Sequence, residues 1–127
     1  MKHTREERAS RFFAGDHHVF NLLGTVSGLW EEADLTGSGR AGTTLVKTSD
    51  LRVVLQVLRI GAALAEHKAP GPITVQVLSG EIRFETGGEI IYMEAGDLLA
   101  LPARQAHSVE AVRDAAFLLT IAPEERH

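Results

Sequence analysis

Turn residues break this chain into short segments, and that pattern limits its possible folds more than any other feature. From Thr43 to Ala122, apolar stretches alternate with small clusters of Gly, Pro, Asp and Ser. Pro70-Gly71-Pro72 is a break that no helix would carry, and Gly87-Gly88 is a strong two-residue hairpin signal. Eight or nine short strands at this spacing predict an all-β sandwich or barrel. The predicted strands cover residues 43–47, 51–60, 63–69, 73–78, 81–86, 89–94, 98–101, 107–112 and 115–122.

The segment before the strands is less regular. Thr4-Arg5-Glu6-Glu7 has the form of a capping box, which favours a short helix over residues 5–13, with a frayed terminal arm as the alternative. Val19–Leu23 is expected to be a first strand. Residues 34–42 are rich in glycine and are expected to form a flexible loop.

Composition excludes several classes of protein. The 127 residues fit one domain, and 44% of them are hydrophobic, which is enough for a hydrophobic core without disulfide bonds or a structural metal ion. The chain has no cysteine, which excludes thiolate metal sites and cysteine nucleophiles and suits a reducing cytoplasm. A net charge of −4 lacks the positive field that nucleic acids require, and no apolar run approaches the roughly 20 residues of a membrane span. We expect a soluble cytoplasmic protein with neither nucleic acid nor membrane as partner.

Two histidines stand on apolar strand faces. Alternation along the strand that ends at Ala69 places His67 among alanines and turns Glu66 and Lys68 the other way. The same argument turns His107 inward on its own strand. Each could be a core histidine bonded to a neighbour, but small residues around a polar ring leave space for water, a ligand or a metal. We expect the two rings to lie within about 8 Å, the reach of a direct or water-bridged contact.

The spacing around these histidines resembles the two motifs of the cupins. Five residues separate Gly61 from His67, and Gly80 follows at the expected distance. In the second motif, five residues separate Gly96 from Pro102, and His107 stands five positions further on. The resemblance implies a double-sheet jelly roll over residues 42–122. Residues 1–41 would then be an arm and a first strand packed on the barrel, and residues 123–127 a tail.

The resemblance also implies an incomplete metal site. Metal-binding cupins use two histidines and a glutamate from the first motif and one histidine from the second. Only His67 and His107 match, because Ala69 and Ile73 replace the other two ligands. Catalytic zinc usually needs about three protein ligands, and non-haem iron needs two histidines and a carboxylate. No cofactor is therefore expected at full occupancy, although a weakly bound divalent metal would fit.

These observations favour a small-molecule-binding cupin with an apolar pocket. The alternatives are a metal-dependent cupin enzyme, such as a dioxygenase or isomerase, and a structural or regulatory module with a filled interior. Some strands have two semi-apolar faces, such as the one that holds Val54 and Leu58. A barrel buries only one face of each strand in its interior, so the apolar residues on the other face need cover. This pattern predicts a homodimer. The predicted ligand-binding residues are His67, His107, Ala69, Ile73, Val75, Val77, Leu99 and Leu101.

Overall fold

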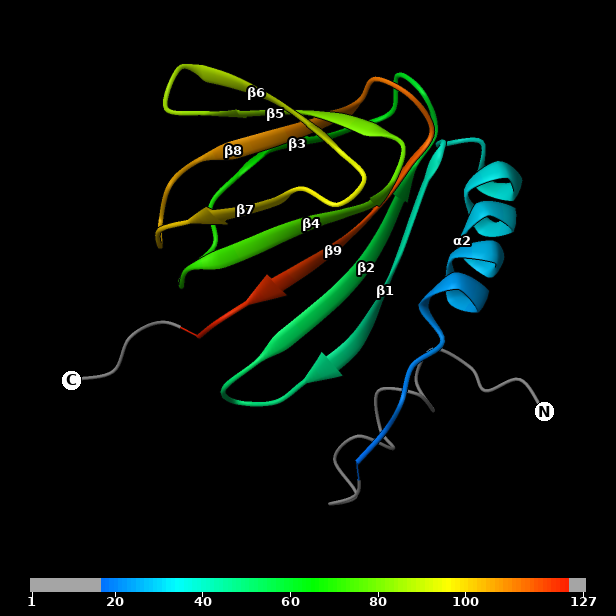
Figure 1. The fold of residues 1–127 in the computed structure, drawn as a ribbon, viewed down its shortest axis with the longest axis horizontal. Helices are drawn as coiled ribbons and strands as arrows, with labels where there is room; N and C mark the ends of the chain where they lie inside the picture. The colour runs from blue at the N-terminus through cyan, green and yellow to red at the C-terminus, as the bar shows by residue number, and fades with distance from the viewer. Residues whose placement is uncertain (1–16, 124–127) are drawn as a thin grey trace.

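The computed structural model describes residues 17–123, and within them the chain forms one helix and nine strands (Figure 1). The strands form two antiparallel sheets that face each other as a jelly roll. One sheet has the order β1-β2-β9-β4-β7 and the other β3-β8-β5-β6. The elements are α2 (Leu22–Thr36), β1 (Arg40–Lys47), β2 (Arg52–Leu58), β3 (Ala63–His67), β4 (Ile73–Ser79), β5 (Glu81–Thr86), β6 (Glu89–Glu94), β7 (Leu98–Leu101), β8 (His107–Ala111) and β9 (Ala115–Ile121).

The hydrophobic core lies between the two sheets. Phe84 on β5 and Phe117 on β9 are its largest fully buried side chains, one from each sheet. Gly87 and Gly88 join β5 to β6 with φ values of 57° and 80°, as a tight hairpin turn with right-handed twist requires. The predicted all-β jelly roll is confirmed, and strand ends differ from the prediction by a few residues.

The prediction of a first strand at Val19–Leu23 is wrong. Asn21 instead caps a helix, because its side chain accepts a hydrogen bond from the amide of Gly24 at 3.1 Å. Gly37 ends that helix with φ 71°, a left-handed conformation that glycine adopts without strain. The expected loop at 34–42 is therefore reduced to the turn between α2 and β1. The helix predicted over residues 5–13 lies outside the described residues.

Helix α2 covers the outer face of the larger sheet (Figure 1). Leu29 and Ala33 are buried against Leu55 and Val57 of β2. The opposite face of β2 points to the second sheet, where Leu58 joins the core. The helix thus supplies cover for an apolar strand face, and the homodimer stays a prediction. No helix within residues 17–123 is long and apolar enough to cross a membrane.

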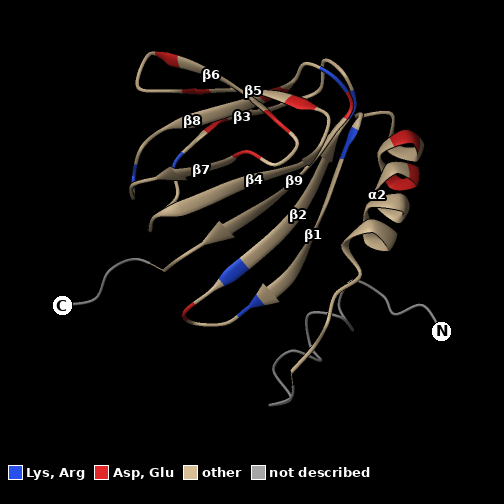
Figure 2. Cartoon of the chain, in the orientation of Figure 1, with Lys and Arg blue, Asp and Glu red and all other residues tan. Residues whose placement is uncertain are grey.

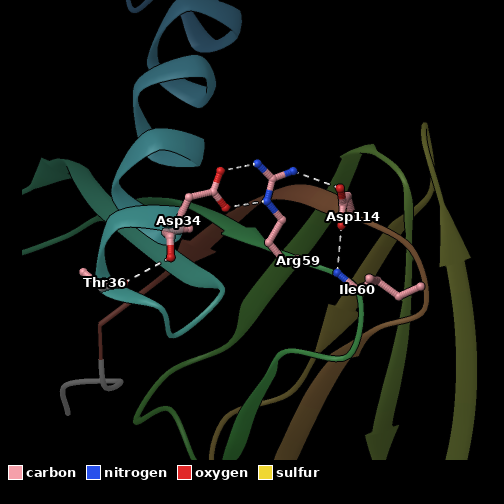
Figure 3. A network of polar contacts seen from close by, with 6 residues as sticks. Asp34, Thr36, Arg59, Ile60 and Asp114 are labelled. Carbon is pink, nitrogen blue, oxygen red and sulfur yellow. Dashed lines mark hydrogen bonds and ion pairs between the residues drawn. The ribbon is translucent and has the colours of Figure 1, made fainter.

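One arginine ties the helix to the barrel (Figure 3). Arg59, just after β2, donates to both carboxylate oxygens of Asp34 at 2.9 and 2.7 Å, and to Asp114 at 2.9 Å. Its guanidinium also lies over the ring of Trp30, 4.2 Å from the ring centroid. Asp114 in turn accepts from the amide of Ile60 at 2.8 Å. The end of α2, the β2–β3 turn and the β8–β9 turn therefore meet at this single side chain.

Candidate functional site

A cavity of about 560 Å³ opens between the two sheets at one end of the barrel. That volume falls in the usual range for small-molecule sites. Its walls come from the β1–β2 turn, the inner face of β2, the end of β3, the start of β4, His107 of β8 and the end of β9. The lining residues are Thr48, Ser49, Leu51, Arg52, Val54, Gln56, Leu64, Ala65, His67, Lys68, Ala69, Pro70, Ile73, His107, Leu119, Ile121, Ala122 and Pro123.

A bulge in β3 aims His67 into this cavity. Leu64 pairs with Val109 and His67 with His107, so three steps along β3 match two along β8. Leu64 and His67 therefore share one face, and Leu64 packs against the core. The predicted alternation over residues 63–69 is wrong here. Lys68, which was expected to point away, lines the cavity.

The two histidine rings meet, as predicted. Their centroids are 4.3 Å apart, with an edge-on angle of 60° between the ring planes. His107 is 3% exposed and stacks nearly parallel on Phe84, at 5.4 Å between centroids. His67 is exposed at the rim rather than enclosed. One ring thus lies at the base of the site and the other at its edge.

Backbone carbonyls orient both rings in the same way. Nδ1 of His67 lies 3.0 Å from the carbonyl oxygen of Ala65, and Nδ1 of His107 lies 3.1 Å from that of Gln105. A carbonyl oxygen only accepts hydrogen bonds, so each Nδ1 donates. In the neutral rings, each Nε2 then carries a lone pair. Burial lowers the pKa of His107, opposed by its hydrogen bond to Gln105 and reinforced by nearby His67. His107 is therefore a neutral hydrogen-bond acceptor at neutral pH.

Acid should destabilise the protein through His107. The unfolded histidine titrates near 6.5 and the folded one lower, so below pH about 6.5 the unfolded chain binds the extra proton. The free energy of unfolding should then decrease as the pH is lowered below about 6.5, and it should stop decreasing once the pH is below the pKa of the folded histidine. Urea unfolding between pH about 5 and 8 would measure this slope. His107→Gln should flatten it and His67→Gln should keep it; an unchanged slope in His107→Gln would contradict the assignment.

The described side chains do not form a usual metal centre. Within residues 17–123, no group of three or more His, Cys, Asp or Glu side chains is placed to hold an ion. Ala69 and Ile73 line the same cavity as the two histidines and offer no donor atoms. Two imidazoles supply less than the three ligands of catalytic zinc or the two-histidine, one-carboxylate set of iron. The described residues around the cavity therefore fit neither metal.

Four of the eight residues that were predicted to bind a ligand lie together at the cavity. His67, His107, Ala69 and Ile73 line the cavity. The other four residues instead pack in or against the hydrophobic core, because the inner face is filled at their depth in the barrel. These four are Val75, Val77, Leu99 and Leu101.

Several cavity residues on β2 and β9 were missed. Arg52, Val54 and Gln56 alternate along β2, and their partners on β9 include Leu119 and Ile121. That face of β2 carries both polar and apolar side chains, which could have indicated that it borders a cavity rather than a fully packed core. Gln56 is held by hydrogen bonds from its amide to the carbonyls of Ala41 and Val57, at 2.9 and 3.3 Å. The polar lining of the site therefore extends beyond the two histidines.

The jelly roll and its paired motif histidines define a cupin-like barrel. The family described as Cupin domain matches residues 54–122, which is more than half of the chain. The chain belongs to this cupin family. A search of curated proteins finds no match.

Solved structures agree with this fold. A conserved protein of unknown function from Streptococcus pyogenes is 27% identical with a TM-score of 0.66, over 70% of this chain and 78% of that one. A Cupin 2 conserved barrel domain protein from Leptotrichia buccalis is 30% identical with a TM-score of 0.63, over 65% of this chain and 40% of its own. The G106A mutant of salicylate 1,2-dioxygenase from Pseudoaminobacter salicylatoxidans is 21% identical with a TM-score of 0.71. That match covers 81% of this chain and 34% of the dioxygenase, and it supports the fold alone.

Proposed function

We propose that this cupin binds a small organic molecule in the cavity, held by hydrogen bonds donated to Nε2 of His67 and His107. The observation that carries the proposal is the pair of rings, 4.3 Å apart, in a cavity of about 560 Å³ with mostly apolar walls. Convergent polar groups in an apolar pocket are the usual form of a ligand site. The bound molecule would combine an apolar body with a hydroxyl or N–H group.

Accessibility of the ring nitrogens argues against a filled structural interior. Among the described residues, Thr43 Oγ1 is the only side-chain polar atom that is both sealed from solvent and without a partner. Nε2 of His107 has no hydrogen-bond partner among those residues, so it must be reachable from the cavity. A module with a filled interior would have sealed and satisfied both rings. Access to Nε2 of His107 therefore supports a ligand site over a filled interior.

Phenol and toluene test the proposal as matched probes, because they share an apolar ring and differ in one hydrogen-bond donor. In NMR of protein with nitrogen-labelled histidine, phenol should shift the Nε2 signals of His67 and His107. Toluene should shift them much less. Val54→Trp, which fills the cavity, should abolish the phenol response. Binding of neither probe would overturn the proposal, and about one tightly bound metal ion per chain would favour the metal-dependent enzyme.

A further inference from the structure

In the part of the chain that the structure describes, the ionisable side chains that line the cavity are all basic or imidazole. Arg52, Lys68 and the two histidines contribute to the wall, and no Asp or Glu among the described residues does so. The chain as a whole is acidic, with 17 Asp and Glu against 13 Lys and Arg. In Figure 2 the acidic colour gathers on α2, β5 and β6, whereas the lower ends of β1 and β2 carry basic bands beside one acidic band in their turn. The cavity therefore differs in charge from the rest of the protein.

Arg52 belongs to the inner face of its sheet. It pairs with Ile121 of β9, which pairs in turn with Ile73 of β4, and all three side chains line the cavity. Arg52 thus extends an apolar row that crosses three strands. The nearby carboxylates, Asp50 in the β1–β2 turn and Glu66 in the β3 bulge, are not part of the cavity wall.

The two cavity cations are without partners among the described residues. Arg59, Arg83 and Arg113 each form an ion pair with a carboxylate. Arg52 and Lys68 form no hydrogen bond or ion pair with any residue of 17–123. A guanidinium at the mouth of an apolar cavity, with no carboxylate in the wall that residues 17–123 form, attracts an anion. Its fork of donors fits a carboxylate in bidentate geometry.

We propose that the ligand is an organic carboxylate, with its carboxylate bound to Arg52, Lys68 adding positive charge, and its apolar body on Val54, Leu119 and Ile121. This inference rests on the proposed function, because the same ligand would donate a hydrogen bond to the histidine pair. A single carboxylate suits this wall better than a phosphate. A phosphate carries more charge and needs more donors than this largely apolar lining supplies.

Three probes of one shape test the charge preference: para-hydroxyphenylacetate, its amide para-hydroxyphenylacetamide, and the cationic tyramine. In calorimetric titrations the carboxylate should bind about 10-fold tighter than the amide, as one charge-assisted contact implies, and tyramine should bind most weakly. Added salt should lower the affinity of the carboxylate and leave that of the neutral amide unchanged. Arg52→Gln should remove most of the advantage of the carboxylate over the amide, with the remainder due to Lys68. Arg113→Gln, which removes an arginine outside the cavity, should change neither.

The outcomes separate the two proposals. Equal affinity for carboxylate and amide, with both shifting the histidine signals, would overturn the carboxylate preference and leave small-molecule binding in place. Binding of none of the probes would overturn both. Inorganic phosphate that binds as tightly as the organic carboxylate would show a simple anion site, and would overturn the apolar-acid assignment.

Discussion

Ala69→His combined with Ile73→Glu is expected to raise the affinity for zinc or manganese by about 100-fold or more, because two ligands join the two existing imidazoles. Both positions already line the cavity beside His67 and His107, so the new side chains would enter the same space. The natural protein should contain no stoichiometric transition metal as purified. Elemental analysis and metal titration of both proteins would measure the change.

A control of similar bulk keeps this test specific. Ala69→Phe with Ile73→Gln alters the same two walls without adding a strong metal ligand. Because Ile73 is only 3% exposed, unfolding of each variant must be measured as well. A gain in both variants would mean that space, not ligand chemistry, controls binding. About one ion per chain in the natural protein would place a ligand elsewhere and would make the enzyme the better interpretation.

Gly80→Ala should cost more than about 3 kcal/mol of folding free energy, whereas Gly61→Ala should cost about 1 kcal/mol. Both glycines have left-handed backbones, with φ values of 78° and 82°. A methyl group on Gly80 would come within 1.9 Å of the carbonyl oxygen of Asp114, whereas one on Gly61 would meet nothing within 4 Å. The difference between the two losses of folding free energy therefore measures the steric contact at Gly80 separately from the backbone strain that both glycine positions share.

Asp114 has little freedom to move away from such a methyl group. Its side chain accepts from the amide of Ile60 and from Arg59. Urea unfolding of both variants at one pH would give the two free energies. Equal losses would show that the β8–β9 turn relaxes, and that strain at the left-handed position accounts for the whole cost.

Turn chemistry made the strands predictable, because it acts locally. Gly87-Gly88 and Pro70-Gly71-Pro72 mark strand ends by backbone preference alone, whatever the rest of the chain does. The bulge in β3 has no such signal. It depends on how β3 meets β8, and it changed the face on which Leu64 lies. His67 does meet His107 at the cavity, but its side chain is exposed at the rim rather than turned inward, and the alternation used to predict its face fails.

The helix at Leu22–Thr36 was predictable in principle. Asn21 before it and Gly37 after it are ordinary cap residues, and the positions of Leu22, Val26, Leu29 and Ala33 form a helical stripe. The sequence does not predict how deep in the barrel each inward side chain lies. Alternation identifies an inner face but not where large side chains such as Phe84 and Phe117 fill it. For that reason Ile73 reaches the cavity while Val75, on the same face, is core.

Because the Arg59 guanidinium lies over its ring, Trp30 can serve as a fluorescence probe of the fold. Trp30 is the only tryptophan, and it is not among the residues that line the cavity. Its emission therefore follows the packing of α2 on the barrel, since undocking would remove both the stacked guanidinium and the sheet from its surroundings. Occupancy of the cavity can be read separately, from the histidine resonances. One sample thus yields two independent signals, one for the integrity of the fold and one for the ligand.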